Sequence, residues 1–244
     1  QLHDQGINKF VLLTGYLGEK IEDYFGDGSS FGWQITYSFG PVQWDTGRRL
    51  WEAKPYIEDR FLLLYSDNFT PFPLGKLLET HFKNNLPLTF MVSKKNPGNI
   101  SINDYGVAQK YSNDRSDKDA NYVEIGYMII EKDLTFSYFD NPDCSFSSVI
   151  NLMVSNHQVG AWIQNDSYHS ISDPKRWIKA EKYLLEDKII FIDRDGVINH
   201  KAQTGEYITR WEDFKIIDDT FDVMKSLSQK GFKFIIITNQ AGVA

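Results

Sequence analysis

The amino-acid sequence predicts an α/β protein of two domains, and three observations support this. Short apolar runs, typical of buried strands, alternate with segments of helical periodicity along the chain. Such alternation indicates a mostly parallel sheet with helices on both faces. Hydrophobic residues make up 41% of the chain, as expected for packed globular domains. The alternating pattern restarts near residue 186, so we expect one domain over residues 1–185 and another over residues 186–244.

In the first domain the expected strands and helices follow one another closely. The expected strands cover residues 9–13, 33–39, 60–65 and 88–92, and the expected helices cover residues 19–25, 46–53, 74–82 and 146–154. Between residues 99 and 127 the pattern changes to short strands and turns, and a polar loop at 112–121 is expected to be solvated surface. Residues 168–185 lead from a strand end into a helix, with Pro174 in its first turn.

The second domain is expected to begin with a strand at residues 189–192, followed by a long polar connection. A helix at residues 221–229 and a strand at residues 232–237 complete a strand–helix–strand unit. Such a crossover places its two strands in one sheet, with their carboxyl ends at the same edge.

Charge, cysteine content and hydropathy exclude several classes of function. The chain has 26 basic and 33 acidic residues, a poor basis for non-specific nucleic-acid binding. Its single cysteine, Cys144, can form neither an internal disulfide nor a cysteine-based zinc site within these residues, so we expect a cytoplasmic protein. No apolar stretch approaches the ~20 residues that cross a membrane, so no membrane insertion is expected. The chain starts at Gln1, without a signal peptide, and stops at Ala244 directly after a strand and turn, so we expect a fragment cut at both ends.

The strongest chemical signal is a pair of carboxylates at the end of an expected strand. Asp193 and Asp195 leave that strand, and Gly196 allows a tight turn beside them. Ligands of open α/β sheets bind at this edge. One carboxylate can attack phosphorus and form an aspartyl-phosphate, while the other protonates the leaving oxygen and then activates water. A hard divalent cation, which we expect to be Mg²⁺, would let the anionic nucleophile approach an anionic phosphate.

Two plainer interpretations compete with this one. An EF-hand calcium loop needs Gly at its sixth position and Glu at its twelfth, where this chain has Ile198 and Thr204, and it follows a helix rather than a strand. That interpretation fails, which leaves a plain surface turn as the alternative. A second strand end weakens it, because Thr238 and Asn239 follow the strand at 232–237. A Thr hydroxyl and free backbone N–H groups there would form an anion cradle beside the aspartates.

These two segments resemble a known superfamily. Asp193-Arg-Asp-Gly-Val-Ile-Asn and Thr238-Asn-Gln-Ala-Gly-Val-Ala are similar to the first two motifs of the haloacid-dehalogenase (HAD) superfamily. The closest branch holds D-glycero-D-manno-heptose 1,7-bisphosphate phosphatase and histidinol phosphatase. The resemblance covers residues 188–244 and implies the first half of a HAD-like Rossmannoid domain. The family's later lysine, its acidic metal motif and any zinc loop lie beyond Ala244, so this half-domain is expected to be inactive.

The HAD resemblance also implies a role for each residue of the two motifs. Asp193 would be the nucleophile and Asp195 the general acid/base. The Asp193 side chain and the Asp195 main-chain carbonyl would hold Mg²⁺. The phosphate would be bound by Thr238, Asn239 and Arg194.

Residues 1–180 carry a second resemblance, to the sugar-phosphate nucleotidyltransferases. It rests on Phe10-Val-Leu-Leu-Thr-Gly15-Tyr16, Thr46-Gly47, Leu64-Tyr-Ser-Asp67-Asn68 and Val123-Glu124-Ile-Gly126-Tyr127. Taken singly, Gly15 and Asp67 are equally well explained as turn residues. The family has a Rossmann-type mixed sheet and joins a sugar 1-phosphate to a nucleoside triphosphate, releasing pyrophosphate. The resemblance assigns Asp67 to Mg²⁺, and Gly15, Glu124 and Gly126 to the nucleotide and sugar.

The chain departs from this second family at three places. The family's glycine-rich triphosphate loop would precede residue 1. Ser170-Ile-Ser-Asp173-Pro aligns with the family's Asp-Ile-Gly-x-Pro, so Ser170 stands where a second metal-binding Asp is expected. Asp173 could take over that metal only with a shifted backbone. Arg48 and Arg49 replace the glycine-rich continuation after Thr46-Gly47.

Together the two resemblances imply a bifunctional protein of activated-heptose synthesis. Removal of the 7-phosphate from a heptose 1,7-bisphosphate gives a sugar 1-phosphate, which a nucleotidyltransferase could activate for lipopolysaccharide, capsule or S-layer glycans. The expected partners are therefore a sugar phosphate, a nucleoside triphosphate and Mg²⁺. Two alternatives stay open. The phosphatase could act on another small ester, such as histidinol phosphate. The N-terminal domain could be a non-catalytic sugar-nucleotide binding module, an alternative that Ser170 motivates.

Overall fold

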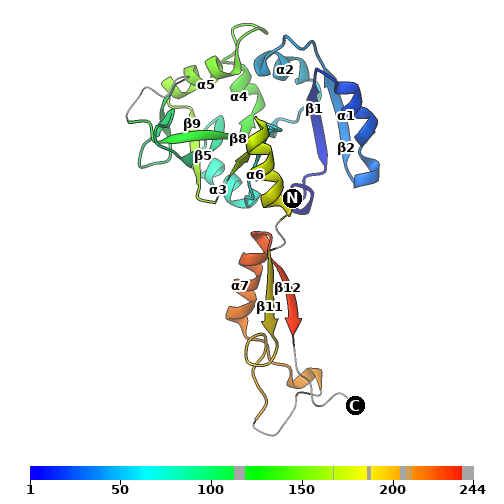
Figure 1. The fold of residues 1–244 in the computed structure, drawn as a ribbon. Coiled ribbons are helices and arrows are strands. Elements are labelled where there is room, and N and C mark those ends of the chain that lie inside the picture. Colours follow the sequence, from blue (N-terminus) through cyan, green and yellow to red (C-terminus); the bar gives the residue numbers. More distant parts are fainter. Residues whose placement is uncertain (113–118, 167, 186–187, 204–207, 209, 238–244) are drawn as a thin grey trace. The chain divides into compact units, whose positions relative to one another are not determined.

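The computed structural model describes residues 1–112, 119–166, 168–185, 188–203, 208 and 210–237. The chain divides into two compact units, residues 1–168 and residues 169–244 (Figure 1). The domain boundary expected near residue 186 falls on residues outside the described ones, and it stays a prediction.

The first unit contains the strands and helices that the sequence predicts up to residue 154, with ends that differ by a few residues, whereas the helix predicted after Pro174 lies in the second unit. Its strands are β1 (Lys9–Thr14), β2 (Gln34–Phe39), β3 (Arg60–Leu64), β4 (Asn68–Phe69), β5 (Leu88–Lys94), β6 (Ile100–Ile102), β7 (Ala108–Tyr111), β8 (Tyr122–Glu131) and β9 (Val159–Gln164). Its α-helices are α1 (Gly18–Phe25), α2 (Thr46–Ala53), α3 (Leu74–Asn84), α4 (Lys132–Phe136) and α5 (Phe146–Ser155), and 3-10 turns lie at His3–Gln5 and Ser29–Phe31.

Six of these strands form one mixed sheet around the long strand β8. Strands β3 and β5 both run antiparallel to β8, whereas β5 and β9 are parallel. Strands β6 and β7 extend the sheet with further antiparallel pairs. Strands β1 and β2 form a separate parallel pair. The mixed sheet is therefore confirmed, but the expectation that it is mostly parallel is wrong, because β8 runs against both of its long neighbours.

Helices cover both faces of the sheet, as the sequence predicts. Successive residues of a strand point to opposite faces, and β5 divides its side chains between two cores accordingly. Phe90 packs with the cluster that includes Val149 of α5, while Met91 packs with the cluster that includes Leu77 of α3. All four side chains are fully or almost fully buried.

A bulge interrupts the pairing of β5 with β8. Phe90 pairs with Met128, but Val92 pairs with Glu124, so β8 contains extra residues between the two pairs. Gly126 lies in this stretch with φ of 81°, a conformation that side chains rarely adopt. Bulges bend a strand and re-aim its side chains, often next to functional sites.

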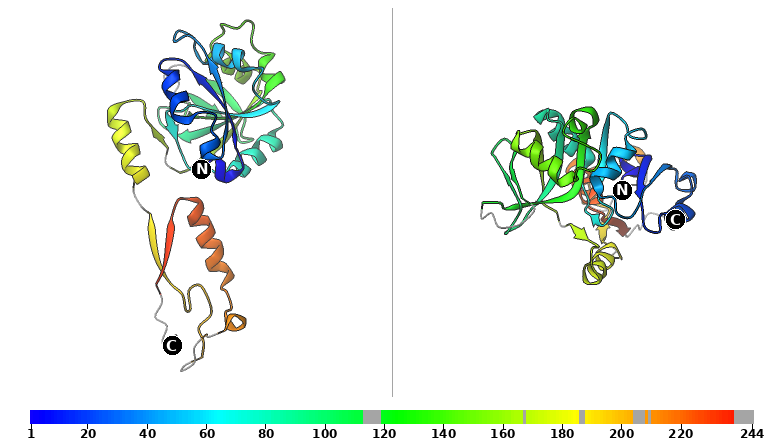
Figure 2. Two further views of the ribbon diagram at one scale, coloured as in Figure 1. Left: turned by 90° about the vertical axis from the view of Figure 1, so that its right-hand side faces the viewer. Right: turned by 90° about the horizontal axis from the view of Figure 1, so that it is seen from above.

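The second unit contains the strand–helix–strand arrangement that the sequence predicts. Its elements are β10 (His169–Ser170), α6 (Pro174–Leu185), β11 (Ile189–Asp193), a 3-10 turn (Trp211–Asp213), α7 (Asp218–Gln229) and β12 (Lys233–Ile237). Strands β11 and β12 are parallel neighbours, and α7 lies along them (Figure 2). The register pairs Asp193 with Ile237, the last described residue. Among the described helices of both units, none is long and apolar enough to cross a lipid bilayer.

Candidate functional site

The first unit has a cleft of ≈ 1280 Å³ beside strands β1 and β3. Most of its wall is apolar, and polar side chains also line it. Among them are Thr14 at the end of β1, Thr46 and Arg49 on α2, and Ser66 and Asp67 after β3. The sequence predicts functional roles for Asp67 and for the segments around Thr14 and Thr46, and the structure places all three at this cleft.

Asp67 lies three residues after the end of β3 and exposes its side chain. A tight turn, in which the Asn68 N–H donates to the Tyr65 carbonyl over 3.1 Å, holds the backbone on either side of it. Within the described part of the chain no hydrogen bond or ion pair is formed to the Asp67 carboxylate. A free carboxylate at a cleft can bind a hard cation, as predicted for this residue.

Glu124 and Gly126 lie next to this turn because β8 pairs with β3. The Tyr65 N–H donates to the Gly126 carbonyl over 2.9 Å, and the Gly126 N–H donates to the Glu124 carboxylate. Burial raises the pKa of Glu124 to about 7, the Gly126 N–H lowers it, and the charge of Asp67 adds to the rise. The structure therefore brings Asp67, Glu124 and Gly126 into one neighbourhood, as the resemblance implies.

The phenols of Tyr65 and Tyr111 belong to the same neighbourhood, which sequence patterns alone do not reveal. Burial raises the pKa of Tyr111 to about 12, and the charge of Glu124 contributes to that rise. The pKa of Tyr65 is also raised, first by burial and then by Glu124, Tyr111 and Asp67. Both phenols therefore stay protonated at neutral pH and can donate hydrogen bonds. In the sequence, the only indication that either phenol belongs to the site is that Tyr65 lies two residues before Asp67.

The loop at Gly15 is held in place by Arg49. In the sequence, Arg49 stands out only as a difference from the nucleotidyltransferase family. The Arg49 guanidinium donates to three backbone carbonyls, those of Thr14 (2.7 Å), Pro41 (2.8 Å) and Trp44 (3.1 Å). A Cβ atom on Gly15 would lie 2.5 Å from this guanidinium, so a side chain there would displace it. Arg49 thus fixes the loop after β1 to the loop before α2. The Thr14 hydroxyl is buried and has no hydrogen-bond partner among the described residues.

Asp173 and Ser170 belong to the second unit and form a local cluster at the start of α6. The Asp173 carboxylate accepts from the Arg176 N–H over 2.9 Å and pairs with the Arg176 guanidinium over 3.2 Å. The same guanidinium donates to the hydroxyls of Ser170 and Ser172. Asp173 therefore caps a helix in this structure, and its expected role as a metal ligand stays a prediction.

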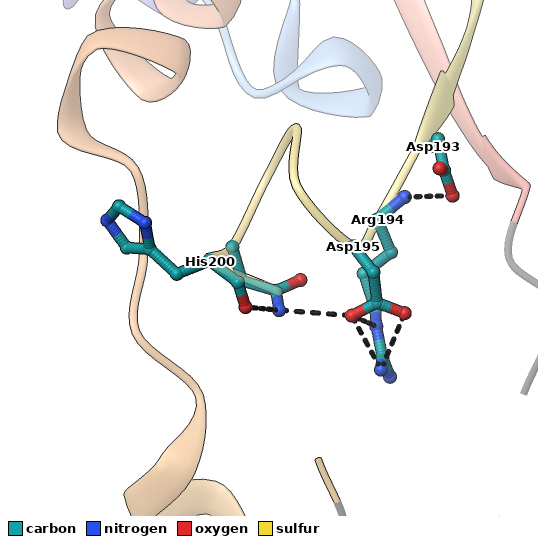
Figure 3. Close-up of polar contacts among 5 residues, drawn as sticks. Asp193, Arg194, Asp195 and His200 are labelled. Atoms are coloured by element: carbon teal, nitrogen blue, oxygen red, sulfur yellow. Dashed lines mark hydrogen bonds and ion pairs between the residues drawn. The ribbon is translucent and has the colours of Figure 1, made fainter. Parts of the chain in front are cut away.

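Asp193 ends strand β11 and Arg194 and Asp195 follow it, and their contacts are drawn in Figure 3. The Arg194 N–H donates to the Asp193 carboxylate over 2.8 Å. The Arg194 guanidinium forms a bidentate pair with Asp195, with distances of 3.0 and 3.1 Å. Asp193 is exposed and Asp195 is half-buried. The predicted phosphate ligand Arg194 is thus already paired with the predicted acid/base Asp195.

The turn after Asp195 is folded tightly by backbone hydrogen bonds. The Gly196 N–H donates to the Asn199 carbonyl over 2.6 Å, and Gly196 has φ of 86°. The Asn199 amide donates to the Asp195 carboxylate over 3.1 Å and to the His200 carbonyl over 2.9 Å. The side-chain amide oxygen (Oδ1) of Asn199 is buried, with no hydrogen-bond partner among the described residues. The turn therefore holds Asp195 in place and leaves one buried oxygen to be satisfied.

The oxygen donors of this turn fit Mg²⁺ in part. Carboxylate and amide oxygens are the ligands that Mg²⁺ prefers, and Asp193, Asp195 and the unpaired Asn199 oxygen are of that kind. The described residues contain no group of three or more His, Cys, Asp or Glu side chains that could enclose a metal ion. The predicted phosphate ligands Thr238 and Asn239 lie outside the described residues. They follow Ile237, which is the register partner of Asp193.

Short stretches of the chain are similar to phosphatases. Over 57 residues the chain is 40% identical to the D-glycero-D-manno-heptose-1,7-bisphosphate 7-phosphatase of Chlorobaculum tepidum, and this match covers 23% of this chain and 28% of that protein. Over 55 residues the chain is 42% identical to the D-glycero-beta-D-manno-heptose-1,7-bisphosphate 7-phosphatase of Escherichia coli K12, and this match covers 22% of this chain and 27% of that protein. The chain thus spans little more than a quarter of the length of these relatives.

The longer similarity is to enzymes that act on sugar phosphates. The chain is 28% identical over 209 residues to the probable glucose-1-phosphate cytidylyltransferase of Bacillus subtilis, covering 72% of this chain and 81% of that protein. No protein-family model matches the chain.

Solved structures with the same fold cover a similar share of the chain. HddC from Yersinia pseudotuberculosis, complexed with GMP-PN, has a TM-score of 0.61 and 18% identity, covering 75% of this chain and 81% of that one. The inositol-1-phosphate CTP transferase from T. maritima has a TM-score of 0.56 and 19% identity, covering 72% and 74%. The mixed sheet, its two helical layers and these neighbours show that most of the chain has the fold of the sugar-phosphate nucleotidyltransferases.

Proposed function

We propose that the first unit belongs to an enzyme that transfers a nucleotidyl group to a sugar 1-phosphate. The observation that carries the proposal is the unpaired carboxylate of Asp67 at the cleft, beside Glu124 and Gly126. The 28% identity to a probable glucose-1-phosphate cytidylyltransferase supports the substrate class. In the reaction a phosphate oxygen of the sugar 1-phosphate attacks the α-phosphorus of the nucleoside triphosphate, and pyrophosphate leaves.

Each residue of this site has a distinct part in the proposal. Asp67 would hold Mg²⁺, which when bound offsets the negative charge of the triphosphate. Arg49 keeps Gly15 and its loop in place at the cleft. Glu124 accepts hydrogen bonds from sugar hydroxyls when ionised, and the phenol of Tyr65 can donate one.

The test is pyrophosphate release by the full-length protein with a panel of sugar 1-phosphates and the common nucleoside triphosphates. Asp67→Asn is expected to lower kcat/KM by at least 100-fold, because the carboxylate charge is lost (about 3 kcal/mol). Asp23→Asn is the matched control, since Asp23 is exposed on α1 and does not line the cleft. Equal activity of the two variants would remove Asp67 from the mechanism.

We further propose that the second unit is the first half of a phosphatase domain that removes the 7-phosphate of D-glycero-D-manno-heptose 1,7-bisphosphate. An Asp193 oxygen attacks phosphorus, the bond from phosphorus to the C7 oxygen breaks, and Asp195 gives that oxygen its proton. Water then attacks the aspartyl-phosphate while Asp195 accepts a proton, which releases inorganic phosphate. The product, a sugar 1-phosphate, is the substrate proposed for the first unit. The protein would thus be bifunctional.

The phosphatase proposal is tested by phosphate release from the heptose bisphosphate by the full-length protein. Asp193→Asn is expected to abolish release, because the neutral amide cannot form the covalent intermediate. Asp222→Asn on α7 is the control, since Asp222 is exposed and lies on the helix rather than at the strand end. Release from histidinol phosphate but not from the heptose ester would keep the chemistry and overturn the substrate.

A second candidate, for the expected N-terminal domain of residues 1–185, is a sugar-nucleotide binding module without catalysis. The contacts of Asp173 favour it, because this carboxylate already caps α6 and pairs with Arg176, while Ser170 lacks a charge. Isothermal titration calorimetry with a nucleotide sugar, run beside the pyrophosphate assay, distinguishes a binding module from an enzyme. Binding without any turnover would support the module, and turnover with any sugar 1-phosphate would overturn it.

A further inference from the structure

Trp211 is the most exposed of the six tryptophans in the chain. Its side chain is 75% exposed, whereas Trp177 is 51% exposed and the other four are half-buried. Tryptophan is enriched at surfaces that bind partners or ligands, because its ring supplies a large and rigid contact area. An indole that its surroundings hold in water is therefore a candidate contact for a ligand.

The position of Trp211 is fixed by its own turn and by a neighbouring ring. It begins the 3-10 turn Trp211–Asp213, and the Phe214 N–H donates to the Trp211 carbonyl over 3.0 Å. The rings of Trp211 and Phe214 stack, with centroids 5.2 Å apart and an angle of 10° between their planes. One face of the indole thus rests on Phe214, and the exposed area lies on the rest of the ring.

The segment after this turn is hydrogen-bonded to the turn that follows Asp195. The His200 N–H donates to the Lys215 carbonyl, and the Ile217 N–H donates to the Ile198 carbonyl, each over 2.9 Å. The two segments run antiparallel, and Ile198 is almost fully buried. The backbone alone therefore holds the aromatic pair beside the aspartate motif.

A side-chain contact makes the same connection. The Arg194 guanidinium, which pairs with Asp195 (Figure 3), lies over the Phe214 ring at 5.9 Å from its centroid. The order outward from Asp195 is thus guanidinium, phenyl ring and indole. Trp211 is the outermost member of a row of stacked groups that begins at the proposed acid/base.

We propose that Trp211 binds the ring of the sugar phosphate whose ester bond the second unit cleaves. This inference rests on the phosphatase function proposed above. The oxygen that Asp195 protonates joins the phosphate to the sugar, so the sugar begins at Asp195 and extends away from the phosphate. A sugar ring presents a face of C–H groups, and this face packs against the flat apolar surface of an indole.

This contact gives selectivity for cyclic over open-chain phosphate esters. Both kinds of ester bring the same phosphate to Asp193 and the same ester oxygen to Asp195. Only a cyclic sugar has a rigid face broad enough to cover the indole, so only its binding depends on Trp211. Binding energy from a part of the substrate remote from the reacting bond contributes to kcat/KM.

The test compares phosphate release from two esters by the full-length protein with Mg²⁺. D-glycero-D-manno-heptose 1,7-bisphosphate has a ring, and glycerol 3-phosphate has none. Trp211→Ala is expected to lower kcat/KM about tenfold for the heptose ester and to leave it within about twofold for glycerol 3-phosphate. Trp211→Phe should recover most of the loss. Trp177→Ala, which removes the other exposed indole, should change neither value.

The outcomes separate this inference from the function on which it rests. Release from the heptose ester with equal kcat/KM in the parent and in Trp211→Ala would keep the phosphatase and overturn the sugar contact. Equal losses for both esters would mean that Trp211 only supports Arg194 through Phe214, and would overturn it too. No release from either ester by the parent would overturn the phosphatase proposal and the sugar contact together.

Fluorescence reports on the indole directly and needs no turnover. In Asp193→Asn, which cannot form the covalent intermediate, the heptose ester should shield Trp211 from quenching by acrylamide, whereas glycerol 3-phosphate should not. The signal of Trp211 is the difference between this variant and the same variant carrying Trp211→Phe. Quenching that the heptose ester leaves unchanged would overturn the proposal. An indole already shielded without ligand would also overturn it, because residues outside 1–244 would then cover the ring.

Discussion

Glu124 should make the stability of the first unit depend on pH above pH 5. Burial raises the pKa of its carboxyl from 4.5 to about 7, although the Gly126 N–H opposes the rise. A carboxyl whose pKa is higher in the folded state is easier to ionise after unfolding. Its contribution to stability is therefore fully present below pH 4.5 and is lost as the pH rises through 7. At roughly 1.4 kcal/mol per pH unit, the loss amounts to about 3 kcal/mol.

The assay is urea-induced unfolding between pH 5 and pH 9, for the parent protein and for Glu124→Gln. Glutamine keeps an oxygen that can accept from the Gly126 N–H but cannot ionise. Other groups titrate equally in both proteins, so the difference between the two free energies of unfolding isolates Glu124. We expect this difference to shift by about 3 kcal/mol in favour of the glutamine variant between pH 5 and pH 8.5.

A matched control separates this effect from the loss of any acidic side chain. Glu79 is exposed on α3, and Glu79→Gln should run parallel to the parent at every pH. If Glu124→Gln also ran parallel, within about 0.5 kcal/mol, the carboxyl would ionise normally, and the account of its buried position would be wrong.

Three further predictions follow from contacts in the structure. Gly126→Ala should cost about 2–4 kcal/mol in urea unfolding, because φ is 81° and a Cβ atom would lie 2.8 Å from Asn68, whereas Gly75→Ala, with nothing within 4 Å, should change stability by less than about 1 kcal/mol. Asp45→Ala should cost about 1 kcal/mol in thermal unfolding, because Asp45 caps α2 by accepting from two backbone N–H groups, and Asp45→Asn should keep most of that stability. Removing Mg²⁺ from the full-length protein with EDTA should stop both pyrophosphate release and phosphate release, and added Mg²⁺ should restore them; activity that survives EDTA would contradict the metal assignment.

The sequence predicts the order of strands and helices well, but it does not predict how the strands pair. Apolar runs and helical periodicity are local signals, and β1, β3, β5, α3 and α5 all lie where those signals place them. Pairing depends on contacts between distant segments. Strand β8 shows the difference, because the sequence predicts short strands and turns up to residue 127, whereas in the structure Tyr122–Glu131 is one ten-residue strand with a bulge around Gly126.

Those residues of the candidate site that lie at or just after the ends of predicted strands could be predicted from the sequence. Asp67 and Asp193 follow apolar runs, and the carboxyl ends of strands are where ligands bind. The resemblance adds Glu124, which the β3–β8 pairing brings next to Asp67 across more than fifty residues of sequence. The hydrogen bonds of Arg49 to three carbonyls could not be predicted, because loops on both sides have to be placed before the guanidinium can reach them.

Gly47 fixes the distance between two helices by having no side chain. A Cβ atom there would lie 2.0 Å from the Cys144 carbonyl oxygen and 2.9 Å from the Phe146 N, and both of these are backbone atoms that cannot rotate away. The first turn of α2 therefore rests directly on the chain that enters α5. The next residues of α2 form one wall of the cleft. The contact of Gly47 with the backbone before α5 therefore fixes the position of that wall and, with it, the width of the cleft. Variants selected for larger substrates should change the lining of the wall and leave this glycine untouched.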